Sequence, residues 1–498
     1  MNNFFLRTCR IRLATYLQVM EKFKKGKIIE KIFRRLPYPL KVLATSYMGL
    51  KNHNKRFTGQ YDDYYKNYKQ LWNAELDQVV AFQNKKIEEL LIDAITFSDW
   101  YKEKAEARGI TIDDIKRDAV AALKRFPILQ KEERRNFTDK LINRNPERAI
   151  AHVGYTSGTS GSPSLNLTDK ESINAGFALW RRFHTSIGLP ETKFRNVRFS
   201  GKIFVEPSCQ KPPFWVYNFV EKQLLMSSYH LSDRYMKYYV DKLNSFRPLL
   251  LDGHASALYI ISDYINRAGL TLTFAPTAIA TTSETLYEYQ RKMIEEVFKC
   301  KVFNQYASSE GAPFITECKK GNLHINLDSG FFEFYRPDRT EAKPGDTAEL
   351  VVTSLKTYKI PLIRYAIKDI VELPLNVQGC GCGCKMPMVQ KIIGREDDLL
   401  WTKERGYCGR MDTAFKGLKH ILKTQIVQKS PELIEIYCIV DKDYTEEMEK
   451  IFIGNLRERL GINIKIKFYY VDNIALGSNG KFDAVKREFP LPDDIQLV

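Results

Sequence analysis

Apolar residues recur at helical spacing in the first quarter of this chain. Ile87, Leu90, Leu91 and Ala94 are spaced as on one face of a helix, and charged residues stand between them. Residues 61–130 are therefore predicted to form amphipathic helices. Residues 1–75 are also helical in pattern, apart from a break at 36–39, and they are strongly basic. We expect residues 1–75 to form a basic helical N-terminal arm.

Further along, short apolar runs alternate with helical stretches. Residues 302–303 and 350–352 have the pattern of strands, and residues 287–298 have that of a helix. Because the loops between them are rich in Gly, Ser and Thr, residues 76–393 are predicted to form a large α/β domain. After a charged turn at 394–398, strand patterns follow at 421–427 and 434–440, then a helix pattern at 446–460 and a further strand pattern at 462–471. This last part, 399–498, is predicted to be a small α+β C-terminal domain.

Charge is unevenly distributed along the 498 residues. The net charge is +17, and residues 1–56, with fourteen Lys/Arg and two acidic residues, contribute +12 of it. The rest of the chain is nearly neutral, whereas nucleic-acid-binding proteins usually spread basic residues over their binding face. No nucleic-acid partner is therefore expected. With 44% apolar residues the composition is that of a globular protein.

The basic arm leaves two interpretations open. Its Lys and Arg residues lie beside apolar ones, namely Phe4, Phe5, Leu13, Tyr16 and Leu17. Residues 1–56 could dock on an anionic membrane, or they could form a solvated helical face that packs on the large domain. No run of about 18 apolar residues predicts a membrane span, and no cleavage site follows the first apolar run. The nine cysteines are sparse and odd in number. We therefore expect a cytoplasmic protein, located at the inner face of the membrane if the arm binds lipid.

The strongest local signal is the hydroxyl-rich and glycine-rich segment 155–163, of sequence YTSGTSGSP. Glycines let backbone N–H groups approach an anion, and Ser and Thr hydroxyls add donors. The segment lacks the Lys-Ser/Thr of a Walker loop. A phosphate-binding loop and a flexible Gly/Ser linker are both compatible with this composition.

The segment resembles the phosphate loop of the adenylate-forming superfamily, in the branch of the phenylacetate–CoA ligases and related capsule-biosynthesis proteins. Four further motifs of that branch follow in order, at 283–286 (SETL), 306–310 (YASSE), 361–369 (PLIRYAIKD) and 394–398 (GREDD), and Gly480-Lys481 resembles its catalytic lysine motif. The motifs span about two thirds of the chain. The resemblance implies a large multi-layer N-terminal domain and a small mobile C-terminal domain joined by a hinge at 394–398.

The resemblance also implies the activity and the residues that carry it. A carboxylic acid would be activated by ATP and Mg²⁺ as an acyl-adenylate and then transferred to CoA. Alternatively, an amine or hydroxyl acceptor in polysaccharide synthesis would take the acyl group. The implied nucleotide-binding and phosphate-binding residues are Thr156, Ser157, Gly158, Thr159, Ser160, Gly161, Ser283, Glu284, Tyr306, Ser309, Asp369 and Arg395. Within this set, Tyr306 would pack on adenine and Asp369 would accept the ribose hydroxyls. Glu310 would bind Mg²⁺, and Lys481 would be the catalytic lysine.

The sequence departs from the motifs of the relatives at four places. Ser164 stands where many relatives carry a lysine, Ala307 replaces a glycine, and Ile367-Lys368 replaces Thr-Gly before Asp369. The motif at 283–286 also lacks its glycine. At Lys368 a side chain stands where a permissive backbone is expected.

A second constellation consists of cysteines and a histidine. Cys318, His324, Cys380 and Cys382 offer the thiolate and imidazole ligands of a tetrahedral structural zinc site. Relatives in the same branch have a similar Cys/His set, with an arginine where Cys384 stands here. Free thiols in a glycine-rich turn are the alternative.

The histidines of two other motifs have no assigned role. His230 (in 228–232), His254 (in 252–256) and the aromatic stretch 212–218 resemble elements that border the acceptor and carboxylate pocket in the capsule-related subgroup. Ordinary core packing explains them equally well.

Overall fold

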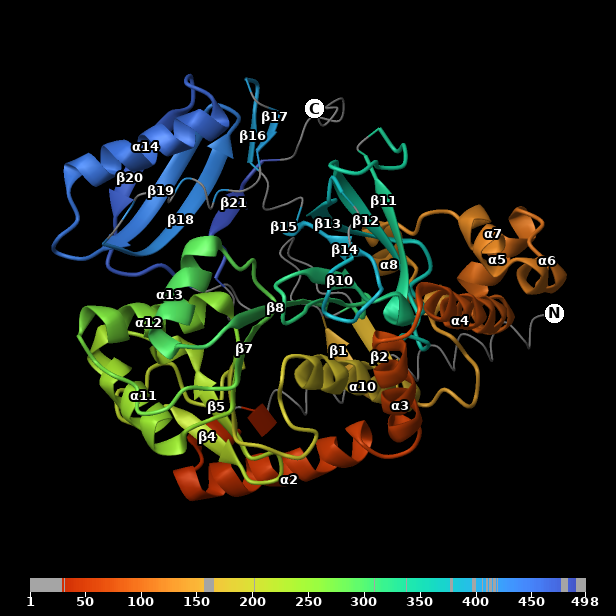
Figure 1. The fold of residues 1–498 in the computed structure, drawn as a ribbon, viewed down its shortest axis with the longest axis horizontal. Helices are drawn as coiled ribbons and strands as arrows, with labels where there is room; N and C mark the ends of the chain where they lie inside the picture. Colours follow the sequence, from red (N-terminus) through yellow and green to blue (C-terminus); the bar gives the residue numbers. More distant parts are fainter. Residues whose placement is uncertain are drawn as a thin grey trace, which may run out of the picture.

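The structure is a computed structural model that describes residues 29–30, 32–155, 165–200, 202–308, 310–336, 338–376, 379–395, 400–404, 406–408, 411, 414, 418, 420–475 and 482–489. Its first part is helical (Figure 1). The helices are α2 (Tyr38–Arg56), α3 (Tyr61–Trp72), α4 (Leu76–Phe97), α5 (Asp99–Ala107), α6 (Ile112–Arg117), α7 (Ala119–Arg125), α8 (Lys131–Asn136) and α9 (Thr138–Leu141). Local signals fix their ends, as at α6, where Thr111 and Asp114 form a reciprocal capping box.

Helices α2 and α3 pack on the large domain. α2 lies along strand β4 (Trp215–Asn218), and α3 lies along helix α10 (Lys170–Ser186). Tyr61, Tyr64 and Tyr68 of α3 are buried against α10. For residues 38–72, the packing interpretation of the basic segment therefore applies. Residues 1–28 and Lys31 lie outside the described residues.

A mixed sheet with a parallel central part forms the centre of the large domain. Within the described residues it has nine strands, in the order β14-β10-β9-β8-β7-β6-β3-β5-β4. Strands β5, β3, β6, β7 and β8 run parallel. The bounds are β3 (Asn196–Ser200), β5 (Gln223–Ser227), β6 (Leu250–Gly253), β7 (Ala278–Thr281), β8 (Val302–Tyr306), β9 (Ile315–Glu317), β10 (Leu323–Ile325) and β14 (Met388–Val389).

The strands of this sheet are covered by helices. β6 and β7 are buried along their whole length, as expected of parallel strands with helices on both faces. The neighbouring helices are α11 (Asp233–Phe246), α12 (Ala255–Arg267) and α13 (Glu288–Phe298), with a short 3-10 turn, η1 (Ser228–His230). At the end of β6 the backbone of Gly253 runs so close to Phe199 that an added Cβ would lie 2.5 Å from the Phe199 carbonyl oxygen.

Two smaller antiparallel sheets complete the large domain. The hairpin β1 (Ile150–Tyr155) and β2 (Leu165–Asp169) pairs Tyr155 with Leu165. The other sheet has the order β11-β12-β13-β15, with β11 (Gly330–Tyr335), β12 (Thr347–Ser354), β13 (Tyr365–Glu372) and β15 (Lys391–Arg395).

The C-terminal unit is a separate α+β layer, drawn in blue at the upper left of Figure 1. Helix α14 (Glu446–Leu460) packs on a four-stranded sheet of order β20-β19-β18-β21 and buries a core of its own around Phe452 and Leu456. The strands are β18 (Ile421–Ser430), β19 (Leu433–Val440), β20 (Lys465–Tyr470) and β21 (Val485–Arg487), beside a small hairpin of β16 (Leu400–Thr402) and β17 (Gly406–Cys408). The α/β fold with a large domain and a small C-terminal α+β domain, predicted from the sequence, is confirmed. Residues 396–398 of the predicted hinge lie outside the described residues.

Candidate active site and Cys/His cluster

The candidate residues gather where the parallel strands end. His254 follows β6, Glu284 follows β7 and Tyr306 is the last residue of β8. The carboxyl ends of neighbouring parallel strands lie at one edge of a sheet, which is where open α/β sheets bind ligands. The topology of the sheet therefore brings together motifs that are far apart in the sequence.

Tyr306 and Asp369 are in direct contact across two sheets. The Tyr306 hydroxyl donates a hydrogen bond to Asp369 Oδ2 at 2.5 Å. Asp369 is buried in β13 and pairs with Arg395 of β15 in the strand register. Three of the predicted nucleotide residues thus share one location. The side chain of Arg395 lies outside the described residues.

The preceding residue, Lys368, has a left-handed backbone with φ +63°. A glycine adopts this conformation without strain, whereas a lysine does so at a cost of about 1 kcal/mol or more. Ser283, at the position where the motif's glycine is missing, has φ +70°. Lys368 and Ser283 therefore both adopt a left-handed backbone conformation that glycine favours. In the motifs of the resembled family, glycine stands at both positions.

Glu310 is a buried carboxylate next to β8. Its Oε2 accepts a hydrogen bond from the Tyr365 hydroxyl at 2.6 Å. Burial and the Glu310 charge raise the pKa of Tyr365, which keeps that hydroxyl a donor. A carboxylate fixed in this way is a suitable ligand for Mg²⁺, which prefers hard oxygen donors. Ser309 lies outside the described residues, as do residues 156–161 and Lys481.

Glu284 joins the large domain to the small one. Its Oε2 accepts the Ser256 N–H of α12 at 3.0 Å, and its Oε1 accepts the Phe482 N–H of the small domain at 3.0 Å. His254 Nδ1 lies 3.7 Å from the same Oε1. Glu284 is thus bound to backbone amides of both domains in this arrangement. Phe482 directly follows Lys481 in the sequence, so the segment with the predicted catalytic lysine ends at the Glu284 contact.

Lys423 of β18, a residue that sequence reasoning missed, belongs to the small domain and lines the pocket that faces the large domain. Its ammonium donates to the Ile474 carbonyl at 2.7 Å and lies 4.4 Å from the centre of the Phe482 ring. Burial, only partly offset by the Glu284 charge, lowers the pKa of Lys423 to about 8. A lone lysine in an alternating strand gives no sequence signal for such a role.

A pocket of about 240 Å³ lies beside these contacts, between the two domains. Its walls come from η1 and α12 of the large domain and from the small domain. The lining includes Tyr229, His254, Ser256, Lys423 and Asn473. Of the two histidines left without a role, His254 therefore faces the interdomain pocket.

His230 has a different environment. Its Nδ1 lies 2.8 Å from Ser227 Oγ, and its Nε2 lies 3.1 Å from the Glu206 carbonyl. Its ring stacks on buried Phe214 at 4.7 Å between centroids. Burial lowers the pKa of His230. The core-packing interpretation therefore applies to His230 and to Phe214 of the aromatic stretch.

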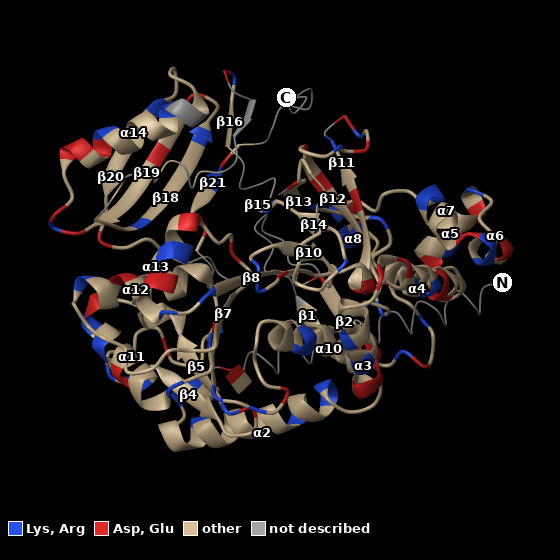
Figure 2. Cartoon of the chain, in the orientation of Figure 1, with Lys and Arg blue, Asp and Glu red and all other residues tan. Residues whose placement is uncertain are grey.

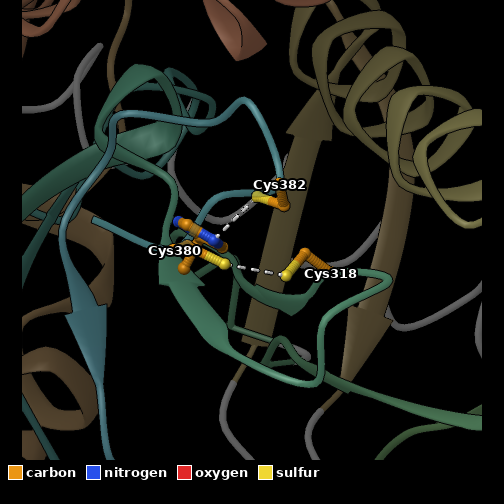
Figure 3. Close-up of side chains that lie close together, drawn as sticks. Cys318, Cys380 and Cys382 are labelled. Atoms are coloured by element: carbon orange, nitrogen blue, oxygen red, sulfur yellow. Dashed lines mark hydrogen bonds between the residues drawn. The ribbon is translucent and has the colours of Figure 1, made fainter. Parts of the chain in front are cut away.

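The four predicted zinc residues come together (Figure 3). The ligand atoms of Cys318, His324, Cys380 and Cys382 all lie within 4.8 Å of one another. The sulfurs of Cys318 and Cys380 are 3.4 Å apart, and Cys382 Sγ is 3.3 Å from His324 Nε2. Ligand atoms about 2.3 Å from a tetrahedral zinc are spaced on this scale. His324 Nδ1 lies 3.0 Å from the Met386 carbonyl, an arrangement that orients the ring of a metal-binding histidine. Cys384 is buried beside these four residues, in an apolar cluster that also contains Cys318, Trp72 and Met386, and it lies within reach of His324.

The fold matches those of known ligases. A 2-hydroxyisobutyryl-CoA ligase in its postadenylation state superposes with a TM-score of 0.64 at 14% identity, over 84% of this chain and 91% of that chain. Phenylacetate-coenzyme A ligase of Thermus thermophilus is 23% identical, over 65% of this chain and 72% of its own length. The chain thus has the fold of the adenylate-forming ligases, as predicted.

The relationship to one family is closer. Protein CapK of Staphylococcus aureus is 32% identical over 462 residues, which are 91% of this chain and 98% of that protein. The family described as the CapK C-terminal domain matches residues 400–488. This chain belongs to the CapK family.

Proposed function

We propose that this protein activates a carboxylic acid with ATP, forming an acyl-adenylate and pyrophosphate, and then transfers the acyl group to an acceptor. The observation that carries the proposal is the meeting of Tyr306, Asp369 and Glu310 at the carboxyl ends of the parallel strands, in the fold of adenylate-forming ligases.

The reaction joins two anions, the carboxylate and the α-phosphate of ATP. Catalysis therefore depends on positioning and on neutralising charge. The buried Asp369 would hold the ribose and Tyr306 the adenine, while the residues at 156–161 would surround the outer phosphates. Glu310 would hold the Mg²⁺ that offsets the phosphate charge, and Lys481 would bring an ammonium to the reacting atoms.

The interdomain contacts would position the small domain for the first half-reaction. Glu284 of the large domain accepts the Phe482 N–H, and within the small domain Lys423 holds Ile474 and Phe482, which lie on either side of the segment with Lys481. The same 2-hydroxyisobutyryl-CoA ligase in its thioesterification state superposes with a lower TM-score, 0.52 against 0.64 for the postadenylation state. This difference supports a domain arrangement suited to the adenylate. The small domain would then move about 394–398 for acyl transfer.

Replacement of Lys423 by methionine is therefore expected to slow adenylation by about tenfold, since it removes a charged hydrogen bond and a cation–π contact. Transfer from a supplied adenylate should change little, and Lys423→Arg should restore part of the adenylation rate. In the unchanged protein this rate should fall as pH rises through about 8, where Lys423 loses its proton. Lys423→Met should lack that decline. Exposed Lys450→Met is the matched control, and equal losses in both half-reactions would contradict a positioning role.

The acceptor is either CoA or an amine or hydroxyl group in polysaccharide synthesis. The names of the phenylacetate-coenzyme A ligases support CoA. The closer and longer match to Protein CapK, 32% against 23% identity, favours the second candidate through the resemblance to capsule-biosynthesis proteins. We expect AMP and pyrophosphate from ATP with one member of an acid library. Product formation that requires CoA would select the first candidate, and turnover with an amine or hydroxyl acceptor alone would select the second. ATP cleavage to ADP would contradict both.

The Cys/His cluster is proposed to hold one structural zinc ion through Cys318, His324, Cys380 and Cys382. The metal would tie the turn at 380–382 to strands β9 and β10, and hence to the sheet that bears the active site. It would supply folding free energy and take no part in the chemistry.

A further inference from the structure

Helix α2 has one face fixed against the large domain. Ser46 Oγ accepts the Phe219 N–H at 3.1 Å, and His53 Nδ1 lies 3.2 Å from Glu221 Oε1. Gly49 faces Asn218 so closely that an added Cβ would lie 2.4 Å from the amide oxygen. This contact explains a glycine in a helix interior, where it costs about 1 kcal/mol relative to alanine. The helix is held in place, so its other face has a defined direction.

The opposite face exposes large apolar side chains. Leu40, Leu43, Tyr47 and Leu50 follow one another at helical spacing and are 47%, 62%, 57% and 48% exposed. Phe219, on the turn that α2 packs against, is 64% exposed. We call these five residues the α2 stripe. A continuous apolar row on the surface marks a contact with another molecule or with a membrane.

The surroundings of the α2 stripe are basic. No Asp or Glu occurs between residues 31 and 61, and α2 in Figure 2 shows blue and tan but no red. The Lys51 ammonium lies 4.6 Å from the centre of the Tyr47 ring. Lys193 and Lys222 flank the turn of Phe219, and Lys193 donates to the Val220 carbonyl at 3.0 Å. Among the described residues no ion pair involves these three lysines, and the acidic residue of the turn, Glu221, faces His53 of α2.

The positive charge around the α2 stripe indicates which kind of molecule can bind there. A second copy of the chain would bring the same basic residues face to face. Residues 1–28 carry seven Lys/Arg and a single acid, so they too would be repelled. An anionic partner is required. Nucleic acid offers phosphates but no apolar layer into which Leu43 and Tyr47 could insert. An anionic bilayer offers phosphates and an apolar layer together.

We propose that the α2 stripe docks on an anionic lipid bilayer, with its apolar side chains at the boundary of headgroups and acyl chains and the nearby lysines on the lipid phosphates. Among the described residues no helix is long and apolar enough to span a bilayer, so the contact is a surface one. In Figure 1, α2 lies at the bottom of the molecule and the small domain at the top. Docking through α2 therefore leaves the small domain and its pocket facing away from the membrane. This inference does not depend on the proposed catalytic activity.

The test is co-sedimentation of the full chain with phosphatidylcholine vesicles that contain or lack phosphatidylglycerol. We expect binding at low salt to the anionic vesicles alone, and release at about 0.5 M salt. Leu43→Ser combined with Tyr47→Ser should weaken binding by about tenfold or more, since both apolar contacts are lost. Lys51→Gln combined with Lys222→Gln should weaken it at low salt and have less effect as salt rises.

The matched control is Leu375→Ser with Ile462→Ser, which removes apolar side chains that are 79% and 74% exposed elsewhere on the surface. These changes should leave vesicle binding unchanged. All positions are exposed, so the melting temperatures should stay equal, and light scattering should report the same oligomeric state for every variant. Three results would overturn the proposal. The unchanged chain could fail to bind anionic vesicles, or the Leu43/Tyr47 and Leu375/Ile462 double variants could bind them equally well. Finally, the unchanged chain could form a dimer that only the Leu43/Tyr47 variant disrupts. Binding of polyglutamate by a chain that does not bind anionic vesicles would instead indicate an acidic protein partner.

Discussion

Replacement of Lys481 by alanine is expected to slow acyl-adenylate formation by about 100-fold or more. The attacking carboxylate and the α-phosphate are both anionic, and a pre-positioned cation at such a site is typically worth about 3–4 kcal/mol of transition-state stabilisation. Acyl transfer from a chemically supplied adenylate should stay largely intact, because in the proposed mechanism the small domain would turn a different surface to the site in that step. Rapid-quench measurement of the two half-reactions checks this separation.

Lys442 provides the control for this variant. It is an exposed lysine of the small domain, so Lys442→Ala should leave both half-reactions unchanged. If Lys481→Ala slowed both steps equally, the lysine would not act through a moving domain. If it slowed neither, the assignment of Lys481 by motif would be wrong.

Replacement of Cys380 by serine is expected to release one zinc ion per chain and to lower the thermal unfolding midpoint by about 5 °C or more. Without the metal, the turn at 380–382 loses its link to β9 and β10, and the metal-binding free energy is lost from folding. Metal analysis of protein purified without added metal, together with calorimetry, measures both effects.

Two other cysteines separate metal binding from packing. Cys384 is buried in the apolar cluster beside the site, so Cys384→Ser should reduce stability while the zinc content stays at one. Cys300 lies elsewhere and is partly exposed, and Cys300→Ser should change neither quantity. Metal-free protein in which Cys318, Cys380 and Cys382 all react freely in the folded state would show that the cluster is only a turn.

The sequence was informative where local pattern decides the structure. Helix α14 has the bounds that its periodicity predicted, and strands β18 and β19 begin and end within a few residues of the predicted ones. The four Cys/His residues meet as their chemistry suggested. The resemblance also placed Tyr306 and Asp369 in one site, and the two side chains are in contact because the fold brings the end of β8 against β13.

The contacts between the domains could not be predicted in this way. Glu284 binds Phe482, almost 200 residues away, only because the small domain sits over the end of β7. Lys423 has no motif, and its role depends on the placement of Ile474 beside it. The exposed apolar face of α2 could not be predicted from the sequence for a related reason. The sequence alone offers lipid docking and packing on the large domain as alternatives, whereas two faces of one helix allow both.

The central claim is that this CapK-family protein forms an acyl-adenylate, and isotope exchange between pyrophosphate and ATP tests it most directly. The exchange should be measured over a library of carboxylic acids, without CoA or any other acceptor. We predict exchange that depends on one class of acid and on Mg²⁺, and that falls by about 100-fold in Lys481→Ala. Exchange that is absent with every acid, in protein that binds ATP, would contradict the claim. Exchange that persists unchanged in Lys481→Ala would contradict the mechanism.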